Sequence, residues 1–186
     1  KGGLVKSVKF KDHKYVGDPI NAVKIFNEKE VDELVILDIS ATTEKRGPNV
    51  EKIKEIASEA FMPLAYGGGI TSLDEIKVLI TAGIEKVILN TSAYHLPNLI
   101  TSGANYVGSQ SIVVSIDIKK NFLGKYKVMI ENGSKSIGTD PVAFAKEMEM
   151  AGAGELCIQS IDRDGTFEGY DLLMIKKISE AVNIPV

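Results

Sequence analysis

Polar residues and glycines follow short aliphatic runs at several points in this 186-residue chain. The glycines at 67–69 come directly after one such run, Asn90 and Thr91 follow the next, and Asp117 ends the run at 112–116. The carboxyl ends of parallel strands meet at one edge of a sheet, where binding and catalytic residues collect. These positions are therefore the first candidates for chemistry.

Two neighbouring segments have the residue types that bind a phosphate group. Gly68 and Gly69 leave backbone N–H groups open to an anion, and the next segment adds the amide of Asn90 and the hydroxyl of Thr91. The glycines alone would equally suit a tight turn. Taken together, the four residues predict a phosphate-binding site.

Asp117 is the candidate for acid–base catalysis, because burial at a strand end can move the pKa of a carboxyl toward neutrality. An aspartate that only caps the strand end is the alternative, and both interpretations also apply to Asp38. Asp162 and Asp164 precede Gly165 in a segment typical of a turn, so we expect them mainly to order a loop. Gly165 is a further candidate for phosphate binding.

Other common chemistries have little support in the sequence. His13 and His95 lack a Cys, His or carboxylate partner at the spacing of a metal site, and no Ser–His or Cys–His pair is evident. We therefore expect no metal and no organic cofactor. The lone Cys157 excludes an internal disulfide, and its apolar surroundings predict a buried strand residue.

The apolar spacing predicts alternating strands and helices. Strands are expected at 4–9, 34–38, 63–66, 86–89, 112–117 and 156–160, with another beginning at 184–186. Helices are expected at 19–29, 50–60, 73–82, 141–151 and 170–182. Continuous aliphatic strands that alternate with helices indicate a parallel sheet covered on both faces.

The sequence also repeats itself at an offset of 122 residues without a gap. Asp18-Pro19 recurs as Asp140-Pro141, and Glu33-Leu34 recurs as Glu155-Leu156. This repeat favours an α/β fold of the (β/α)8 TIM barrel type with two-fold internal duplication over an open, doubly wound sheet. We expect residues 1–186 to form a single barrel domain, incomplete at both ends, with about six and a half βα units and a second phosphate loop beyond the last residue.

The composition limits the classes of partner that the protein is expected to bind. The 22 basic and 25 acidic residues give a net charge of −3 and are dispersed, which argues against nucleic-acid binding. No apolar stretch approaches the roughly 20 residues of a membrane span, so no membrane association is expected. A cytoplasmic location is the resulting expectation.

Several of these segments together resemble the cyclase subunit of imidazole glycerol phosphate synthase. They are the segments at 31–39, 66–70, 85–91, 114–117 and 160–166, and the Asp-Arg-Asp-Gly-Thr string within the last is the most specific. The resemblance implies a duplicated barrel that uses ammonia from a partner glutaminase. It also implies a bisphosphorylated substrate, a phosphoribulosyl-formimino aminoimidazole carboxamide ribonucleotide, and two products, imidazole glycerol phosphate and an aminoimidazole carboxamide ribonucleotide.

The resemblance also implies roles for particular residues. Asp117 resembles the family's catalytic aspartate on the fifth strand, and Lys6 resembles the lysine of its first loop. By the same resemblance, one phosphate site includes Gly69, Asn90 and Thr91, and the other includes Gly165. A charged gate for ammonia at the bottom of the barrel is implied for Glu33, Lys86 and Glu155.

Two positions depart from the cyclase pattern. Gln159 stands where the cyclase has threonine beside the reacting centre, and Ser7 follows Lys6 where the cyclase has glycine. The family's other catalytic aspartate would lie upstream of Lys1. The alternatives are therefore a paralogue that amidates a surface-polysaccharide sugar with a glutaminase partner, and a non-catalytic barrel that only binds a partner.

Overall fold

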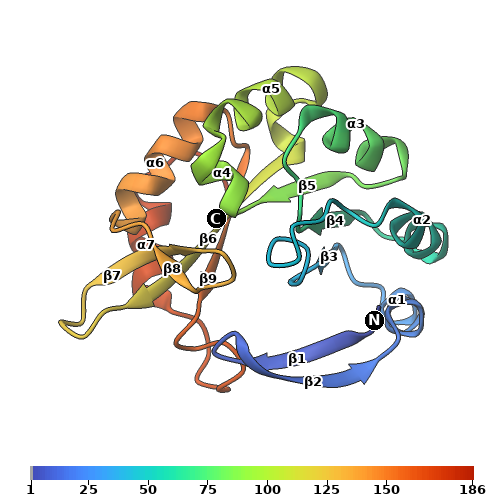
Figure 1. The fold of residues 1–186 in the computed structure, drawn as a ribbon, viewed down its shortest axis with the longest axis horizontal. Helices are drawn as coiled ribbons and strands as arrows, with labels where there is room; N and C mark the ends of the chain where they lie inside the picture. Colours follow the sequence, from blue (N-terminus) through green and yellow to red (C-terminus); the bar gives the residue numbers. More distant parts are fainter. Residues whose placement is uncertain (1) are drawn as a thin grey trace.

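The computed structural model describes residues 2–186, and its central feature is a curled sheet of five parallel strands (Figure 1). In spatial order they are β3 (Leu34–Leu37), β4 (Leu64–Gly67), β5 (Lys86–Leu89), β6 (Ile112–Lys120) and β9 (Glu155–Ser160). The strands follow chain order, and each crossover contains at least one helix. This is the arrangement of a partial (β/α)8 barrel, as the sequence predicts.

Helices lie along the outside of the curved sheet (Figure 1). The expected ones are α1 (Pro19–Glu28), α2 (Val50–Glu59), α3 (Leu73–Thr81), α6 (Pro141–Ala151) and α7 (Leu172–Ser179). After β5 the chain also forms α4 (Thr91–His95), α5 (Pro97–Val107) and the 3₁₀ turn η1 (Ser109–Ser111), which the sequence analysis missed. Gly103 interrupts the apolar pattern of α5. A glycine fits at this position because a β-carbon would crowd the side chains of Ile76 and Ile112.

None of the helices in the described part of the chain combines the length and the apolar character that crossing a bilayer requires.

The prediction that residues 4–9 form a strand of the barrel is wrong. They form β1 (Leu4–Val8), which pairs antiparallel with β2 (Lys11–Gly17) in a separate two-stranded sheet. Lys9 and Phe10 have φ values of 54° and 59°, which reverse the chain between the two strands. The lysines on both strands also favour solvent, whereas a barrel strand must be buried on both faces.

A second hairpin extends the carboxyl end of β6. This strand runs to Lys120, past the predicted end at residue 117, and pairs antiparallel with β7 (Tyr126–Ile130), which pairs in turn with β8 (Lys135–Ser136). Left-handed conformations at Glu131, Asn132 and Gly133 form the turn between β7 and β8. This hairpin is not among the predicted elements.

The internal repeat is visible in equivalent contacts. The side chains of Asp18 and Asp140 each accept hydrogen bonds from the two N–H groups that begin α1 and α6. The N–H of Leu34 donates to the carbonyl of Pro63 at 3.0 Å, and the N–H of Leu156, which is 122 residues later, donates to the carbonyl of Pro185 at 2.9 Å. No strand is assigned at 184–186, contrary to expectation, although this contact brings the segment alongside the start of β9.

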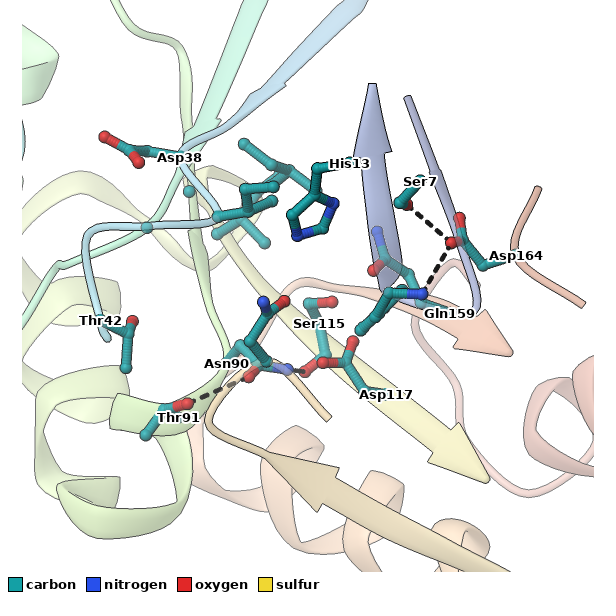
Figure 2. Close-up of a pocket in the computed structure, with 17 residues that line it drawn as sticks. Ser7, His13, Asp38, Thr42, Asn90, Thr91, Ser115, Asp117, Gln159 and Asp164 are labelled. Carbon is teal, nitrogen blue, oxygen red and sulfur yellow. Dashed lines mark hydrogen bonds between the residues drawn. The ribbon is translucent and has the colours of Figure 1, made fainter. Parts of the chain in front are cut away.

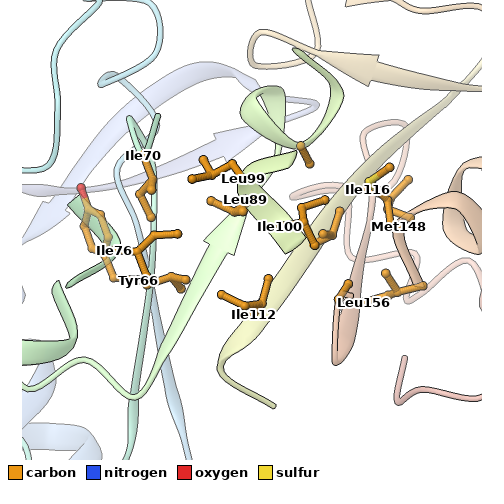
Figure 3. Close-up of a cluster of buried hydrophobic side chains, with 14 of the residues drawn as sticks. Tyr66, Ile70, Ile76, Leu89, Leu99, Ile100, Ile112, Ile116, Met148 and Leu156 are labelled. Carbon is orange, nitrogen blue, oxygen red and sulfur yellow. The ribbon is translucent and has the colours of Figure 1, made fainter. Parts of the chain in front are cut away.

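Both faces of the sheet are covered by apolar side chains. The larger cluster lies between strands and helices and includes Leu89, Ile112 and Leu156 (Figure 3). On the inner face, Ala65, Ile88 and Val113 form a smaller cluster, against which Cys157 packs. Cys157 is therefore a strand residue as predicted, but it is only partly buried.

The first prediction concerns the repeated helix caps. Asp140→Ala removes the acceptor for the N–H groups of Val142 and Ala143 and should lower the free energy of unfolding by about 1 kcal/mol in urea denaturation. Asp140→Asn keeps a side-chain oxygen and is the matched control. Equal losses in the two variants would show that the cap is not the source of the effect.

Candidate active site

A cavity of about 240 Å³ opens at the carboxyl ends of the parallel strands (Figure 2). Its lining comes from β3, β4, β5, β6, β9 and the β1–β2 hairpin. Among the predicted site residues, it brings together Asp38, Gly68, Asn90, Thr91, Asp117, Gln159 and Asp164. We call it the mouth cavity.

Asp117 is the buried acid of the mouth cavity. Only 5% of the residue is exposed, and it lies in register with Gln159 on the adjacent strand β9. Burial raises the pKa of Asp117 to about 7, although the polar side chains of Asn90 and Ser115 act in the opposite direction. A carboxyl with that pKa is present in both protonation states near neutral pH, so it can accept and return a proton.

A chain of hydrogen bonds fixes the amide of Asn90 beside Asp117. The backbone N–H of Glu131 donates to Thr91 Oγ1 at 2.9 Å, and Thr91 Oγ1 donates to Asn90 Oδ1 at 3.2 Å. Asn90 Nδ2 donates to the carbonyl of Ser115 at 3.0 Å. The β7–β8 turn therefore orients a residue of the mouth cavity through Thr91.

The predicted phosphate residues line a neighbouring cavity of about 360 Å³. Gly68, Gly69, Asn90 and Thr91 all border it. Lys45, Arg46 and His95 add cationic or protonatable groups to its wall, which suits an anion. The two glycines also have a packing role, since their φ values are 118° and 71° and β-carbons would collide with backbone oxygens of the 38–47 segment.

Asp38 orders the loop after β3. Arg46 donates from Nη1 to Asp38 Oδ2 at 2.7 Å and from Nη2 to Oδ1 at 3.0 Å, and the N–H of Ser40 also donates to Oδ1. Burial favours the protonated form, but these hydrogen bonds outweigh it and hold the pKa of Asp38 below its ordinary value. Its carboxylate points away from Asp117 in Figure 2, so the structural interpretation of Asp38 fits better than the catalytic one.

Asp164 docks the β1–β2 hairpin at the rim. Its Oδ2 accepts from Ser7 Oγ at 2.8 Å and from the N–H of Phe10 at 3.0 Å, and its carbonyl accepts from the N–H of Lys9 at 2.9 Å. Gly165 packs so close to the Ser7 carbonyl that a β-carbon would not fit. The loop-ordering role expected for Asp164 thus extends to a second element of the fold.

The structure separates Lys6 from Asp117. The Lys6 ammonium lies 4.5 Å from the centre of the Phe167 ring, and Lys6 is not among the residues that line the mouth cavity. Phe167, Gly165 and Gln159 instead line a third cavity of about 380 Å³ beside β9. The predicted catalytic residues Lys6 and Asp117 therefore do not share one cavity.

A charged cluster lies at the opposite end of the sheet. Lys86 Nζ lies 2.8 Å from Glu155 Oε2 and 3.0 Å from Glu33 Oε2. Hydrogen bonds from its ammonium, first to Glu155 and then to Glu33, raise the pKa of Lys86. The resemblance implies a gate formed by these three residues, and the structure places Lys86 in contact with both carboxylates.

Sequence reasoning missed His13 as a residue of the mouth cavity. His13 lies on β2, and its ring points into the cavity in Figure 2. The sequence shows only a histidine in a polar segment without partners. Its place at the mouth depends on the docking of the hairpin, for which the sequence offers only the Ser7 and Asp164 side chains, 157 positions apart.

Parallel βα units, a buried acid at the carboxyl ends of the strands and a charged cluster at the other end of the sheet define a partial (β/α)8 barrel with a candidate active site at its mouth. The family model described as "Histidine biosynthesis protein" matches residues 1–186, and the chain belongs to this family.

Several curated relatives match the whole chain. It is 48% identical over 186 residues to "Putative imidazole glycerol phosphate synthase subunit HisF" of Leptospira interrogans, covering all of this chain and 73% of the relative. It is 50% identical over 184 residues to "Putative imidazole glycerol phosphate synthase subunit hisF2" of Pseudomonas aeruginosa, and the match covers 99% of this chain and 73% of the relative. It is 43% identical over 200 residues to imidazole glycerol phosphate synthase subunit HisF of Methanoregula boonei, and the match covers 100% of this chain and 75% of the relative.

The raised pKa of Asp117 predicts a stability that falls as the pH rises. The unfolded chain releases this proton near the ordinary pKa of an aspartate, whereas the folded protein holds it until about pH 7. The stabilising contribution is therefore complete below about pH 4 and is lost as the pH rises through 7. Relative to Asp117→Asn, the wild type should lose up to about 4 kcal/mol of unfolding free energy between these limits in urea denaturation. A difference that does not vary with pH would contradict this prediction.

Proposed function

We propose that this protein is the ammonia-dependent cyclase of histidine biosynthesis. In this proposal it converts the phosphoribulosyl-formimino aminoimidazole carboxamide ribonucleotide to imidazole glycerol phosphate and an aminoimidazole carboxamide ribonucleotide. The observation that carries the proposal is the buried Asp117, whose pKa of about 7 suits proton transfer during ring closure. Membership in the histidine biosynthesis family supports it.

The cavities beside Asp117 support a substrate with a phosphate at each end. One phosphate would bind where Gly69, Asn90 and Thr91 meet the cationic wall of the 360 Å³ cavity. The other would bind near Gly165 in the 380 Å³ cavity, to which Arg163 contributes a guanidinium. Gln159 lines both this cavity and the mouth cavity, so it would contact the part of the substrate between the phosphates.

The opposite end of the sheet supports ammonia entry from a partner. The relatives are named as subunits of a synthase, and we propose that the partner is a glutaminase. The cluster of Lys86 with Glu33 and Glu155 would form the gate, because its ion pairs can part and re-form without apolar repacking. A cytoplasmic location follows from the proposal, since charged phosphorylated metabolites do not cross a bilayer unaided.

A paralogue that amidates a surface-polysaccharide sugar is the second candidate. Two departures from the cyclase pattern favour it: Gln159 lies in register beside Asp117, and Ser7 bonds the rim residue Asp164. Both departures alter the residues around the mouth cavity, whereas the three residues of the proposed gate are kept. A barrel that only binds a partner is the weaker alternative, because it would gain nothing from an acid as deeply buried as Asp117.

The proposed function predicts that Asp117→Asn abolishes ammonium-dependent turnover. The full-length protein is assayed with an ammonium salt and the nucleotide substrate by ultraviolet absorbance. Loss of a positioned acid–base group should lower kcat by about 100-fold or more, with the circular dichroism spectrum unchanged. Absence of turnover by the wild type would remove the cyclase proposal and favour the paralogue, whereas an active Asp117→Asn would remove only this residue from the mechanism.

The proposed gate predicts that a mutation in it affects turnover with glutamine more than turnover with an ammonium salt. Lys86→Met removes the cation that joins Glu33 and Glu155, leaving two carboxylates without their partner. With the glutaminase present, glutamine-dependent turnover should fall more than ammonium-dependent turnover, because free ammonia can also enter by the mouth. Lys77→Met, which removes an exposed ion pair with Asp74, is the control. Equal losses from both sources would contradict a gating role.

A further inference from the structure

The hairpin of β6 and β7, which projects beyond the parallel sheet (Figure 1), carries a concentration of positive charge. Residues 118–130 span the end of β6, the turn and β7, and they include four lysines and no acidic residue, in a chain with a net charge of −3. Lys120 and Lys125 are exposed, and Lys119 and Lys127 are partly exposed. The hairpin is therefore a local positive region at the carboxyl end of β6.

Two of these lysines lie directly opposite each other on the side of the mouth cavity. Lys119 on β6 is in register with Lys127 on β7, two residues beyond the pair of Asp117 with Met129. Side chains two positions apart share a face of a strand, so both lysines lie on the face from which Asp117 enters the mouth cavity. We call Lys119 and Lys127 the lysine pair.

The lysine pair has no acidic partner within residues 2–186. Lys127 Nζ donates to the carbonyl of Gly138 at 2.7 Å, which leaves its positive charge uncompensated. Glu131, the next acid along the chain, lies 3.6 Å from the ammonium of Lys135 instead. Like charges directly opposite each other destabilise an antiparallel pair of strands, so the fold keeps the lysine pair at a cost in stability.

Contacts with the following loop brace the hairpin. Asp162 Oδ2 accepts from the backbone N–H of Lys120 at 2.8 Å, and the hydroxyl of Tyr126 donates to the buried Asp171 at 2.6 Å. The ammonium of Lys120 lies 4.8 Å from the centre of the Tyr126 ring, on the face opposite the lysine pair. The lysine pair is therefore held in place by an ordered element of the fold.

Uncompensated cations beside an active site attract an anionic ligand before it binds. Charges of one sign near a cleft raise the local concentration of a ligand of the opposite sign and speed its association, and ionic strength screens the effect. The substrate of the proposed reaction has a phosphate at each end. Asp117 repels such a ligand when its carboxyl is ionised, and two nearby cations offset that repulsion.

We propose that Lys119 and Lys127 form an electrostatic guide that draws the bisphosphorylated substrate toward the mouth cavity. This inference rests on the proposed cyclase function. Neither lysine is among the residues that line the mouth cavity, so the guide acts on the approach of the substrate and not on the chemical step. It should therefore affect kcat/KM and leave kcat unchanged.

The test replaces both lysines in the full-length protein, which is assayed with an ammonium salt and the nucleotide substrate. In Lys119→Gln/Lys127→Gln, kcat/KM should fall by about tenfold at an ionic strength of about 10 mM, where the Debye length is about 30 Å. Near 1 M, where the Debye length is about 3 Å, the difference should shrink to less than about twofold. Lys119→Arg/Lys127→Arg keeps both charges and should retain the kcat/KM of the wild type.

A control variant and a measurement without turnover complete the test. Lys146→Gln/Lys177→Gln removes the same charge from exposed positions on α6 and α7, outside the barrel, and should leave kcat/KM nearly unchanged. In urea denaturation at low salt, Lys119→Gln/Lys127→Gln should be at least as stable as the wild type, because the repulsion between the two lysines is removed.

Four results would overturn the inference while leaving the cyclase function in place. They are an unchanged kcat/KM in Lys119→Gln/Lys127→Gln at low salt, a loss that persists near 1 M salt, an equal loss in the control, and a less stable glutamine variant. A wild type without turnover would be a different result, because it would remove the proposed function and this inference with it.

Discussion

The structure depends on burying both faces of a parallel sheet. Backbone groups of β4, β5 and β6 are paired on both sides, and apolar side chains cover the outer and inner faces. Charged residues on these strands lie at the start of β5, where Lys86 stands, and in the carboxyl half of β6 from Asp117 onward, since a charge deeper in the sheet would lack both water and a partner. The same constraint creates a chemical mouth at one end and a charged cluster at the other.

Asp117 shows how this constraint generates reactivity. It lies where the inner face of β6 passes from the apolar interior to the mouth, so it is desolvated but still in reach of a ligand. Asn90 and Ser115 oppose the effect of burial without cancelling it. The resulting acid destabilises the folded protein near neutral pH, which is a common cost of a functional site.

The two hairpins adapt a repeated scaffold to one site. The βα units are duplicated, as the equivalent contacts at Pro63 and Pro185 show, whereas the hairpins occupy particular places in the chain. The β7–β8 turn holds Thr91, and the β1–β2 hairpin brings His13 to the rim. Residues outside the parallel sheet thereby complete a mouth whose base is formed by the parallel strands.

The sequence by itself determined the βα order, the duplication, the helix caps and the places of Gly69 and Asn90 just after β4 and β5. Each of these depends on local patterns or on a fixed offset in the chain. Only the tertiary structure decided that residues 4–9 belong to a hairpin, that Arg46 neutralises Asp38, that Lys6 turns toward Phe167 and that His13 faces the mouth. Most of these outcomes arise from contacts between residues far apart in the chain, and no local pattern encodes which distant side chain will be the neighbour.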